Sequence, residues 1–202
     1  MQCWGYNADF ELGTSQPQPD RLGASGVHFF ADGASGSVAQ IAGSVGAGTL
    51  AGNRQLSGYH TCALFTGGQV NCWGYGLDGQ LNGQSTSSIA AVAWTASNVP
   101  SPAKAIGAGG YHSCAVGGDD RIYCWGNDNW AQLGSGNIRY GAQATTLVVA
   151  IPKARSVAAG AFHTCAVIAN NDIRCWGAND WGQSGRRGGP NDYAATPVQP
   201  QL

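Results

Sequence analysis

Hydrophobic and polar residues alternate in short runs along this chain, without the roughly 3.6-residue period of an amphipathic helix. Between residues 60 and 74, two such runs flank a Gly-Gly turn at 67–68, which is the pattern of a β-hairpin. Alternation along a strand places His60, Cys62 and Leu64 on one face. We therefore predict an antiparallel register in which Cys62 lies opposite Cys72, residue 60 opposite 74 and residue 64 opposite 70.

The same hairpin occurs three times, and its first cysteines lie 52 and 51 residues apart (114−62 and 165−114). Its first strand recurs at 58–64, 110–116 and 161–167. Each copy is followed by Cys-Trp-Gly and then by a Gln-Leu-Gly-like motif, and a fourth Cys-Trp-Gly lies at 3–5. A further apolar strand precedes two copies, at 103–108 and 154–159. Short strands and Gly-rich turns repeated every ~50 residues predict an all-β chain, a β-propeller with about one four-stranded blade per repeat.

The repeats divide the chain into segments of a single array. We expect a half repeat at 1–22, an extended loop at 23–52, and full repeats at about 53–104, 105–155 and 156–202. The loop accounts for the first interval between Cys-Trp-Gly motifs, which is 69 residues (72−3) against 52 and 51 for the next two. This organisation predicts a partial propeller of about four blades that belongs to a larger ring.

Composition limits the classes of function. Only 10% of the residues are charged and the net charge is −1, so the clustered basic face of a nucleic-acid binder is not expected. Arg186-Arg187, the densest basic spot, is flanked by glycine and is interpreted as a solvated loop. No apolar run approaches the ~20 residues of a spanning helix. No signal peptide precedes Cys3, so we expect the chain to begin inside a repeat.

The combined motifs resemble the repeat of the regulator of chromosome condensation family, in a cysteine-rich, bacterial type. The matching elements are Gly110–Val116, Ile122–Gly126 and Gln132-Leu133-Gly134. The resemblance implies a propeller, commonly of seven blades. Three and a half copies are fewer, which leaves a fragment of a longer propeller or a half-ring that closes by dimerising. The exchange-factor and ubiquitin-ligase roles known in that family do not carry over, because the matching residues are structural.

Six of the seven cysteines form three pairs that are ten residues apart, and the first, Cys3, has no partner at that spacing. The pairs are Cys62 and Cys72, Cys114 and Cys124, and Cys165 and Cys175. Cross-strand disulfides are favoured over buried free thiols, which remain the alternative. Disulfides predict an oxidising compartment: extracellular, periplasmic or cell-surface. His60, Cys62 and Cys72 resemble part of a zinc site, but their recurrence in every repeat favours a structural role, so no metal is expected.

The seven tryptophans and the three repeat histidines fall into two groups. Seven occupy repeat positions and are expected to be structural, with the tryptophans packing between blades: Trp4, Trp73, Trp125, Trp176, His60, His112 and His163. Each histidine is expected to bond a neighbouring backbone group. Trp130 and Trp181, in the loops before Gln-Leu-Gly and Gln-Ser-Gly, and Trp94, in a variable loop, are candidate binding residues, with packing as the alternative.

No catalytic constellation, phosphate loop or paired carboxylate is recognisable, so we expect neither an enzyme nor a cofactor. The sequence predicts a non-enzymatic protein-protein interaction module within a secreted or cell-surface propeller, for a partner that it does not name. A glycan-binding, adhesin-like module and a building block of an oligomer or filament are the alternatives, and an enzyme ranks last. The chain is expected either to self-associate or to be completed by further repeats.

Overall fold

The computed structural model describes residues 2–7, 18–26, 37–44, 59–84, 90–95, 99–100, 102–149, 151 and 153–201. These residues form fourteen strands: β1 (Gln2–Asn7), β2 (Gln18–Gly26), β3 (Val38–Gly43), β4 (His60–Phe65), β5 (Val70–Gly74), β6 (Ala90–Thr95), β7 (Ala105–Ala108), β8 (His112–Val116), β9 (Ile122–Asp128), β10 (Arg139–Val149), β11 (Ala154–Ala159), β12 (His163–Ile168), β13 (Ile173–Ala178) and β14 (Tyr193–Val198). Within these ranges, no helix could cross a membrane.

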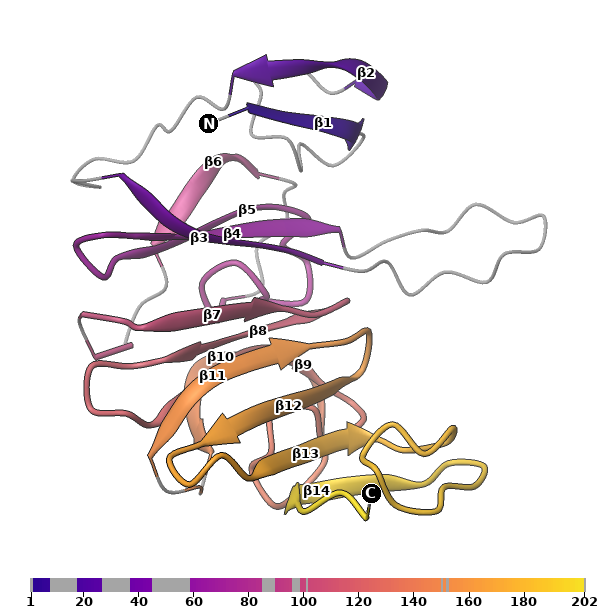
Figure 1. The fold of residues 1–202 in the computed structure, drawn as a ribbon. Helices are drawn as coiled ribbons and strands as arrows, with labels where there is room; N and C mark the ends of the chain where they lie inside the picture. Colours follow the sequence, from indigo (N-terminus) through magenta and orange to yellow (C-terminus); the bar gives the residue numbers. More distant parts are fainter. Residues whose placement is uncertain are drawn as a thin grey trace.

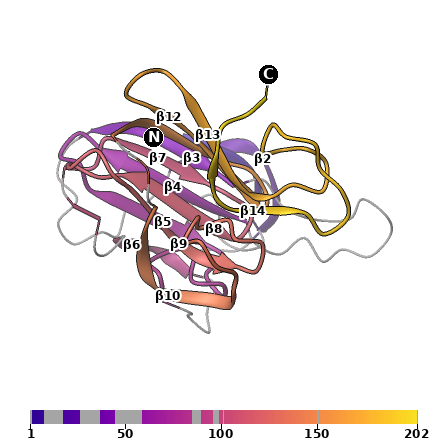
Figure 2. The same ribbon diagram turned by 90° about the horizontal axis from the view of Figure 1, so that it is seen from below.

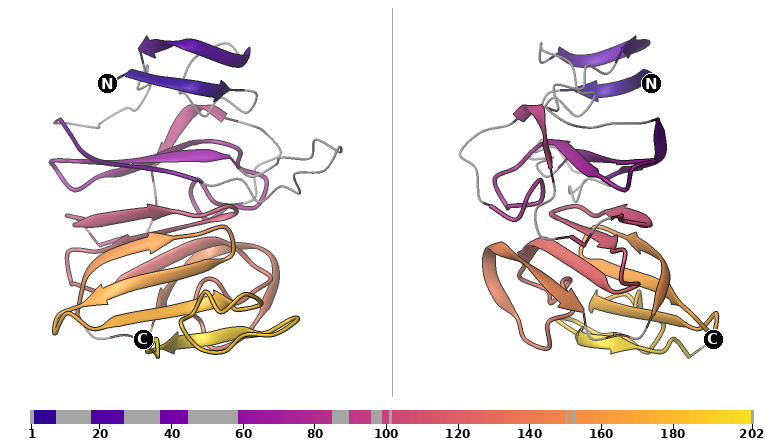
Figure 3. Two further views of the ribbon diagram at one scale, coloured as in Figure 1. Left: turned by 45° about the vertical axis from the view of Figure 1, so that its right-hand side comes forward. Right: turned by 90° about the vertical axis from the view of Figure 1, so that its left-hand side faces the viewer.

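The strands build three four-stranded antiparallel sheets in simple chain order, β3–β6, β7–β10 and β11–β14, which we call the first, second and third sheets. A two-stranded sheet, β1–β2, lies at the opposite end of the stack from the third sheet (Figure 1). The sheets lie one on another with their strands roughly aligned (Figures 2 and 3). The prediction of an all-β fold with one four-stranded sheet per repeat is confirmed for these three sheets.

The register of the central hairpins is the one that the alternation predicts. Cys62 pairs with Cys72, His60 with Gly74 and Leu64 with Val70, and the second and third sheets repeat this pairing. The glycine of Cys-Trp-Gly has a positive φ in all three sheets, +108°, +106° and +98°. A Cβ at Gly126 would lie 2.6 Å from the carbonyl oxygen of Tyr111. The motif therefore requires glycine for both conformation and space.

The structure corrects the expected loop at 23–52 in the parts that it describes, 23–26 and 37–44, and the rest of that range lies outside the described residues. Strand β2 extends to Gly26 and Val38–Gly43 forms β3, whose small residues resemble loop composition. The side-chain NH₂ group of Gln40 donates to the carbonyl of Ile106 in the second sheet, and its side-chain oxygen accepts the Ile106 N–H, each at 3.0 Å. Sixteen residues separate β3 from β4, against three between β7 and β8 and three between β11 and β12. Trp94 likewise lies in strand β6, opposite Cys72, and not in a loop.

Two apolar layers of the core lie one on each face of the second sheet, and a third cluster joins Ala63, Phe65 and Trp73 within the first sheet. The first layer joins Cys62, Leu64 and Val70 to Ile106 and Trp125. The second joins residues of β8 and β9 to those of the third sheet: Cys114, Val116, Ile122, Cys124, Val157, Ala166 and Trp176. Because each layer needs two sheets, one repeat alone would leave its apolar face in water.

A group of buried hydrogen bonds, which we call a latch, joins the neighbouring sheets across each of these two layers. The Ser113 hydroxyl donates to the carbonyl of Gln80 at 2.9 Å, and the Trp125 indole donates to the same oxygen at 2.9 Å. His60 Nε2 lies 2.7 Å from the Ser113 hydroxyl. The single hydroxyl proton is already donated, so His60 Nε2 must carry a proton and donate.

The next latch has the same pattern. Thr164 and Trp176 donate to the carbonyl of Gln132 at 2.9 and 2.8 Å, and His112 Nε2 lies 2.8 Å from the Thr164 hydroxyl. Nε2 of His60 and of His112 thus has a side-chain hydroxyl of the following sheet as its partner, where a backbone group was expected. Burial, with smaller contributions from His60 and His163, lowers the pKa of His112 to about 3, so its ring stays neutral.

Candidate binding site

The Gln of each Gln-Leu-Gly-like motif folds the turn that precedes it. The side-chain oxygen of Gln132 accepts a bond from the backbone N–H of Trp130 at 2.8 Å, and Gln183 makes the same 2.8 Å bond to Trp181. The equivalent bond in the first sheet, from Asp78 to Gln80, is 3.0 Å long. The Gln therefore fixes the backbone of the residue two positions before it, and places that residue in the equivalent turn of each sheet.

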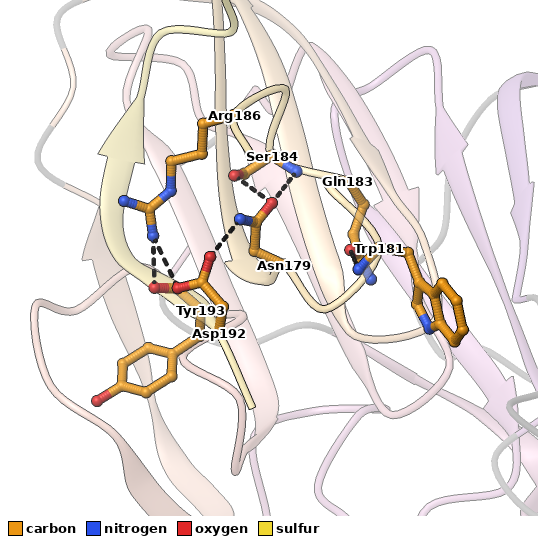
Figure 4. Close-up of polar contacts among 7 residues, drawn as sticks. All are labelled: Asn179, Trp181, Gln183, Ser184, Arg186, Asp192 and Tyr193. Atoms are coloured by element: carbon orange, nitrogen blue, oxygen red, sulfur yellow. Dashed lines mark hydrogen bonds and ion pairs between the residues drawn. The ribbon is translucent and has the colours of Figure 1, made fainter. Parts of the chain in front are cut away.

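The two presented tryptophans lie in different surroundings. Trp130 is half-buried, with its ring centroid 6.3 Å from that of Phe162. Phe162 stacks in turn on Tyr111, with centroids 5.5 Å apart. Trp181 has no such neighbour among the described residues: it is 91% exposed and extends away from the polar contacts of its loop (Figure 4). Only Trp130 joins a larger aromatic cluster.

A pocket of about 390 Å³ opens beside Trp130, between the β9–β10 and β13–β14 loops. Its lining contains no charged side chain and consists of Asn129, Trp130, Ile138, Tyr140, Asn191 and Tyr193. Tyr140 is 85% exposed and Tyr193 is 40% exposed. We call Tyr111, Phe162, Trp130, Tyr140 and Tyr193 the aromatic surface. It joins the inner turns of the second and third sheets to their outer strands.

A polar network supports the Tyr193 side of the pocket (Figure 4). Asn179 accepts bonds from the backbone N–H and hydroxyl of Ser184 at 2.9 and 2.6 Å. The side-chain NH₂ group of Asn179 donates to the Asp192 carboxylate at 2.5 Å. Arg186 donates to Asp192 at 3.3 Å and to the carbonyl of Tyr193 at 2.8 Å. Side chains of the preceding loop thus hold the backbone at the start of β14, where Tyr193 lies.

A buried carboxylate supports the Trp130 side. Asp128, which occupies the position equivalent to Asn179, accepts bonds from the Leu133 N–H at 3.0 Å and the Ser135 hydroxyl at 3.4 Å. Its side chain has no measurable exposure. Burial raises the pKa of Asp128 to about 6, although the bonds from Leu133 and Ser135 and the charge of Arg139 oppose the shift.

The remaining predicted residues lie elsewhere. The structure brings the sulfur atoms of Cys62 and Cys72, of Cys114 and Cys124, and of Cys165 and Cys175 together, with 4.1 Å between the Cα atoms of each pair. Cys3 and Trp4 lie in β1 and Trp94 lies in β6, and their side chains are outside the described part of the structure. Among the described residues, no group of three His, Cys, Asp or Glu side chains could hold a metal ion.

The pocket also contains residues that sequence analysis missed. Asn129, Ile138, Tyr140, Asn191 and Tyr193 lie outside the repeated motifs. The sequence could have indicated Tyr140 and Tyr193, because each lies at the start of the strand that follows a Gln-Leu-Gly-like motif and its loop. Their loops differ in length and composition, which conceals the equivalence.

Comparison with known proteins identifies the repeats. Family models of the regulator of chromosome condensation (RCC1) repeat match residues 103–129 and 154–183, and residues 119–167. The chain is an RCC1-repeat protein. It is 30% identical to the human E3 ubiquitin-protein ligase HERC2 over 149 residues, which are 69% of this chain and 3% of that protein. It is 32% identical to protein pim1 of Schizosaccharomyces pombe over 137 residues, 62% of this chain and 25% of pim1.

Solved RCC1 structures share the fold. Yeast RCC1 (Prp20), crystallised in a complex with Kap60, matches with a TM-score of 0.72 and 21% identity, over all of this chain and 44% of that one. Human WBSCR16 matches with a TM-score of 0.63 and 21% identity, over 98% of this chain and 44% of that one. These matches confirm the β-propeller fold. This RCC1-repeat chain spans less than half the length of either structure.

Proposed function

We propose that this chain is a non-enzymatic interaction module that binds another protein through the aromatic surface. The observation that carries the proposal is the uncharged pocket at Trp130, whose rim includes the 85% exposed Tyr140. Contiguous exposed aromatic side chains are unusual on a soluble protein that binds nothing. Tryptophan and tyrosine also dominate the energetics of protein interfaces. RCC1-repeat folds are typically interaction modules, which agrees with this assignment.

The chemistry of the described residues supports a non-enzymatic role. The lining of the pocket pairs no nucleophile with a base. The two groups with strongly shifted pKa values are accounted for by structure: His112 belongs to a latch between sheets, and Asp128 holds the β9–β10 loop. Perturbed titratable groups are common at catalytic centres, but structural networks perturb them as well.

We propose further that the protein folds in an oxidising compartment: extracellular, periplasmic or at a cell surface. The support is the placement of three cysteine pairs, each on directly opposed strand positions. Disulfides persist in such compartments and are rare where glutathione keeps thiols reduced. Intact mass after alkylation without reductant tests this: six protected cysteines and one modified are expected, and seven modified would refute it.

The third sheet supports the proposal that a further sheet covers it, from additional repeats or from a second copy. His112 engages a hydroxyl of the sheet that follows it, whereas the His163 ring has no hydrogen bond to a described residue. Light scattering distinguishes the two sources. A mass near twice 20.7 kDa indicates a second copy, and a monomer that aggregates as concentration rises leaves further repeats as the source.

Selection from a displayed random-peptide library tests the binding function. The selected peptides should lose binding to Trp130→Ala and Tyr140→Ala, and should keep it with Trp181→Ala. Trp181 is the matched control, because it occupies the same repeat position but lies outside the pocket. Peptides that bind all three variants equally would exclude the aromatic surface as the site. A glycan array in parallel tests the alternative: sugar binding that Trp130→Ala abolishes would favour a carbohydrate module.

A further inference from the structure

Four of the residues that line the pocket carry hydrogen-bond donors that nothing in the described structure accepts. The side-chain oxygen of Asn129 accepts the backbone N–H of Gly141 at 2.7 Å, which fixes the orientation of the amide. The NH₂ group of Asn129 bonds to no described residue. The same holds for the indole N–H of Trp130 and the hydroxyls of Tyr140 and Tyr193. The lining therefore combines aromatic faces with unused donors.

These groups restrict the chemistry of a ligand. An indole N–H only donates, and the Asn129 amide donates as well, because its oxygen is already engaged. With no charged side chain in the lining, the pocket gives no preference to a charged ligand. The aromatic rings favour flat or ring-shaped apolar groups that pack against them. A matching ligand is uncharged and rich in acceptors, with compact apolar rings.

The shape of the aromatic surface favours an extended ligand. Tyr111 stacks on Phe162 at 5.5 Å, and Phe162 lies 6.3 Å from Trp130. Trp130 lines the pocket together with Tyr140 and Tyr193. Ring contacts thus connect Tyr111, Phe162 and Trp130 across two sheets, so the aromatic side chains extend beyond the pocket itself.

We propose that the pocket binds an uncharged, proline-rich segment of a partner protein in the polyproline II conformation. This inference rests on the proposed function and names its ligand. Polyproline II has no internal hydrogen bonds, so its carbonyl groups are free to accept, and proline has no N–H to satisfy. Aromatic-lined grooves recognise such segments because the ligand is already ordered before it binds. The hydrogen-bond donors of the pocket would bind the peptide carbonyls, and its aromatic rings would pack against the proline rings.

The first test is calorimetric titration of the intact chain with an acetylated, amidated decaproline peptide. A Gly-Ser peptide of the same length is the control. Decaproline should bind and the Gly-Ser peptide should not. Trp130→Ala should weaken binding by at least about tenfold, as expected for an aromatic hot spot, and Trp181→Ala should change it by less than about twofold. Because Trp130 is half-buried, Tyr140→Ala, at a largely exposed position, provides a second variant without a folding penalty.

An isosteric substitution tests the donor argument. Asn129→Asp keeps an oxygen for the Gly141 N–H and replaces the NH₂ group with a second oxygen. Facing a peptide carbonyl, that oxygen repels, and decaproline binding should weaken by about tenfold. A ligand that donates hydrogen bonds would bind this variant equally well or better. Unchanged or stronger decaproline binding by Asn129→Asp would overturn the inference.

The library selection separates this inference from the function on which it rests. Proline-rich peptides that depend on Trp130 support both. Peptides without proline that depend on Trp130 leave the interaction function intact and overturn the polyproline assignment. Cellohexaose binding in place of decaproline overturns the assignment as well. Peptides whose binding is unchanged by Trp130→Ala and by Tyr140→Ala refute the function and the inference together.

Discussion

The second and third sheets repeat nearly the same sequence, yet their central strands are buried to different extents. Strand β8 is buried at every residue, whereas β12 is buried only at every second residue. The partly exposed positions of β12 are His163, Cys165 and Val167, which share one strand face. The second sheet has a neighbour on each face, and the third has one described neighbour. The repeat motif therefore specifies a surface for packing, and the neighbouring sheet decides whether that surface is buried.

The histidines show the same difference in their chemistry. His112 is fully buried and bonds Thr164, and burial lowers its pKa to about 3. His163 is half-buried, and burial lowers its pKa too. One motif thus supplies a neutral latch in the second sheet and an accessible imidazole in the third.

The largest expected effect is the unequal cost of removing the two histidines. His112→Ala should lower the free energy of unfolding by about 3 kcal/mol, because it opens a cavity and removes a buried hydrogen bond. His163→Ala should cost less than about 1 kcal/mol, as expected for a partly exposed position. Urea unfolding at pH 7.5 measures both. Equal losses would show that the open face of β12 is covered in solution.

Reduction of the disulfides sharpens the comparison. Each bridge closes a short loop and should contribute about 2–3 kcal/mol. Cys114 and Cys124 have no exposure, whereas Cys165 is partly exposed. Attack by a thiolate needs access to sulfur, so the Cys165–Cys175 bridge should be reduced first under native conditions.

Timed alkylation with mass spectrometry gives the order of reduction, and Cys62–Cys72, with 1% and 0% exposure, is the matched buried control. Simultaneous loss of all three bridges would indicate global unfolding. Earlier loss of Cys114–Cys124 would contradict the assigned burial.

Asp128 and Asn179 occupy equivalent buried positions in the second and third sheets, and this exchange of an acid for an amide predicts a dependence on pH. Burial raises the pKa of Asp128 to about 6, above its ordinary 3.8, so the folded state binds a proton more readily than the unfolded state between these values. The stabilisation from this proton is present below pH 3.8 and is lost as pH rises through 6. At pH 7 the buried charge therefore destabilises the fold.

Asp128→Asn copies the residue of the next sheet and keeps the acceptor for the Leu133 N–H. It should stabilise the protein by about 2 kcal/mol at pH 7, and the gain should disappear near pH 4. Thermal unfolding of both proteins from pH 4 to 8 measures the difference. His112 acts oppositely, because its pKa is lowered and its stabilisation declines as pH falls below 6.5. A difference that does not vary with pH would refute the assigned shift.

Local patterns in the sequence predicted the hairpins, and their limits explain what was missed. Alternation and repeat spacing were sufficient for the pairing of Cys62 with Cys72, because strand register depends on nearest neighbours. Strand β3 was not predicted, because its residues are small and the contact that holds it joins Gln40 to Ile106, 66 positions away. Trp130 and Trp181 occupy one repeat position, and the sequence does not distinguish them. Phe162 and the β13–β14 loop, which come from another repeat, make Trp130 part of a pocket.

The smallest expected effect concerns the stability of the two tryptophan variants. Trp130→Ala should lower the free energy of unfolding by about 1–2 kcal/mol, because a half-buried ring loses its contact with Phe162. Trp181→Ala should change it by less than about 0.5 kcal/mol, since the side chain is 91% exposed. Urea unfolding of both variants measures the difference. A comparable loss in Trp181→Ala would place its ring in a contact in solution, and the third sheet would then have a neighbour at its loop end as well.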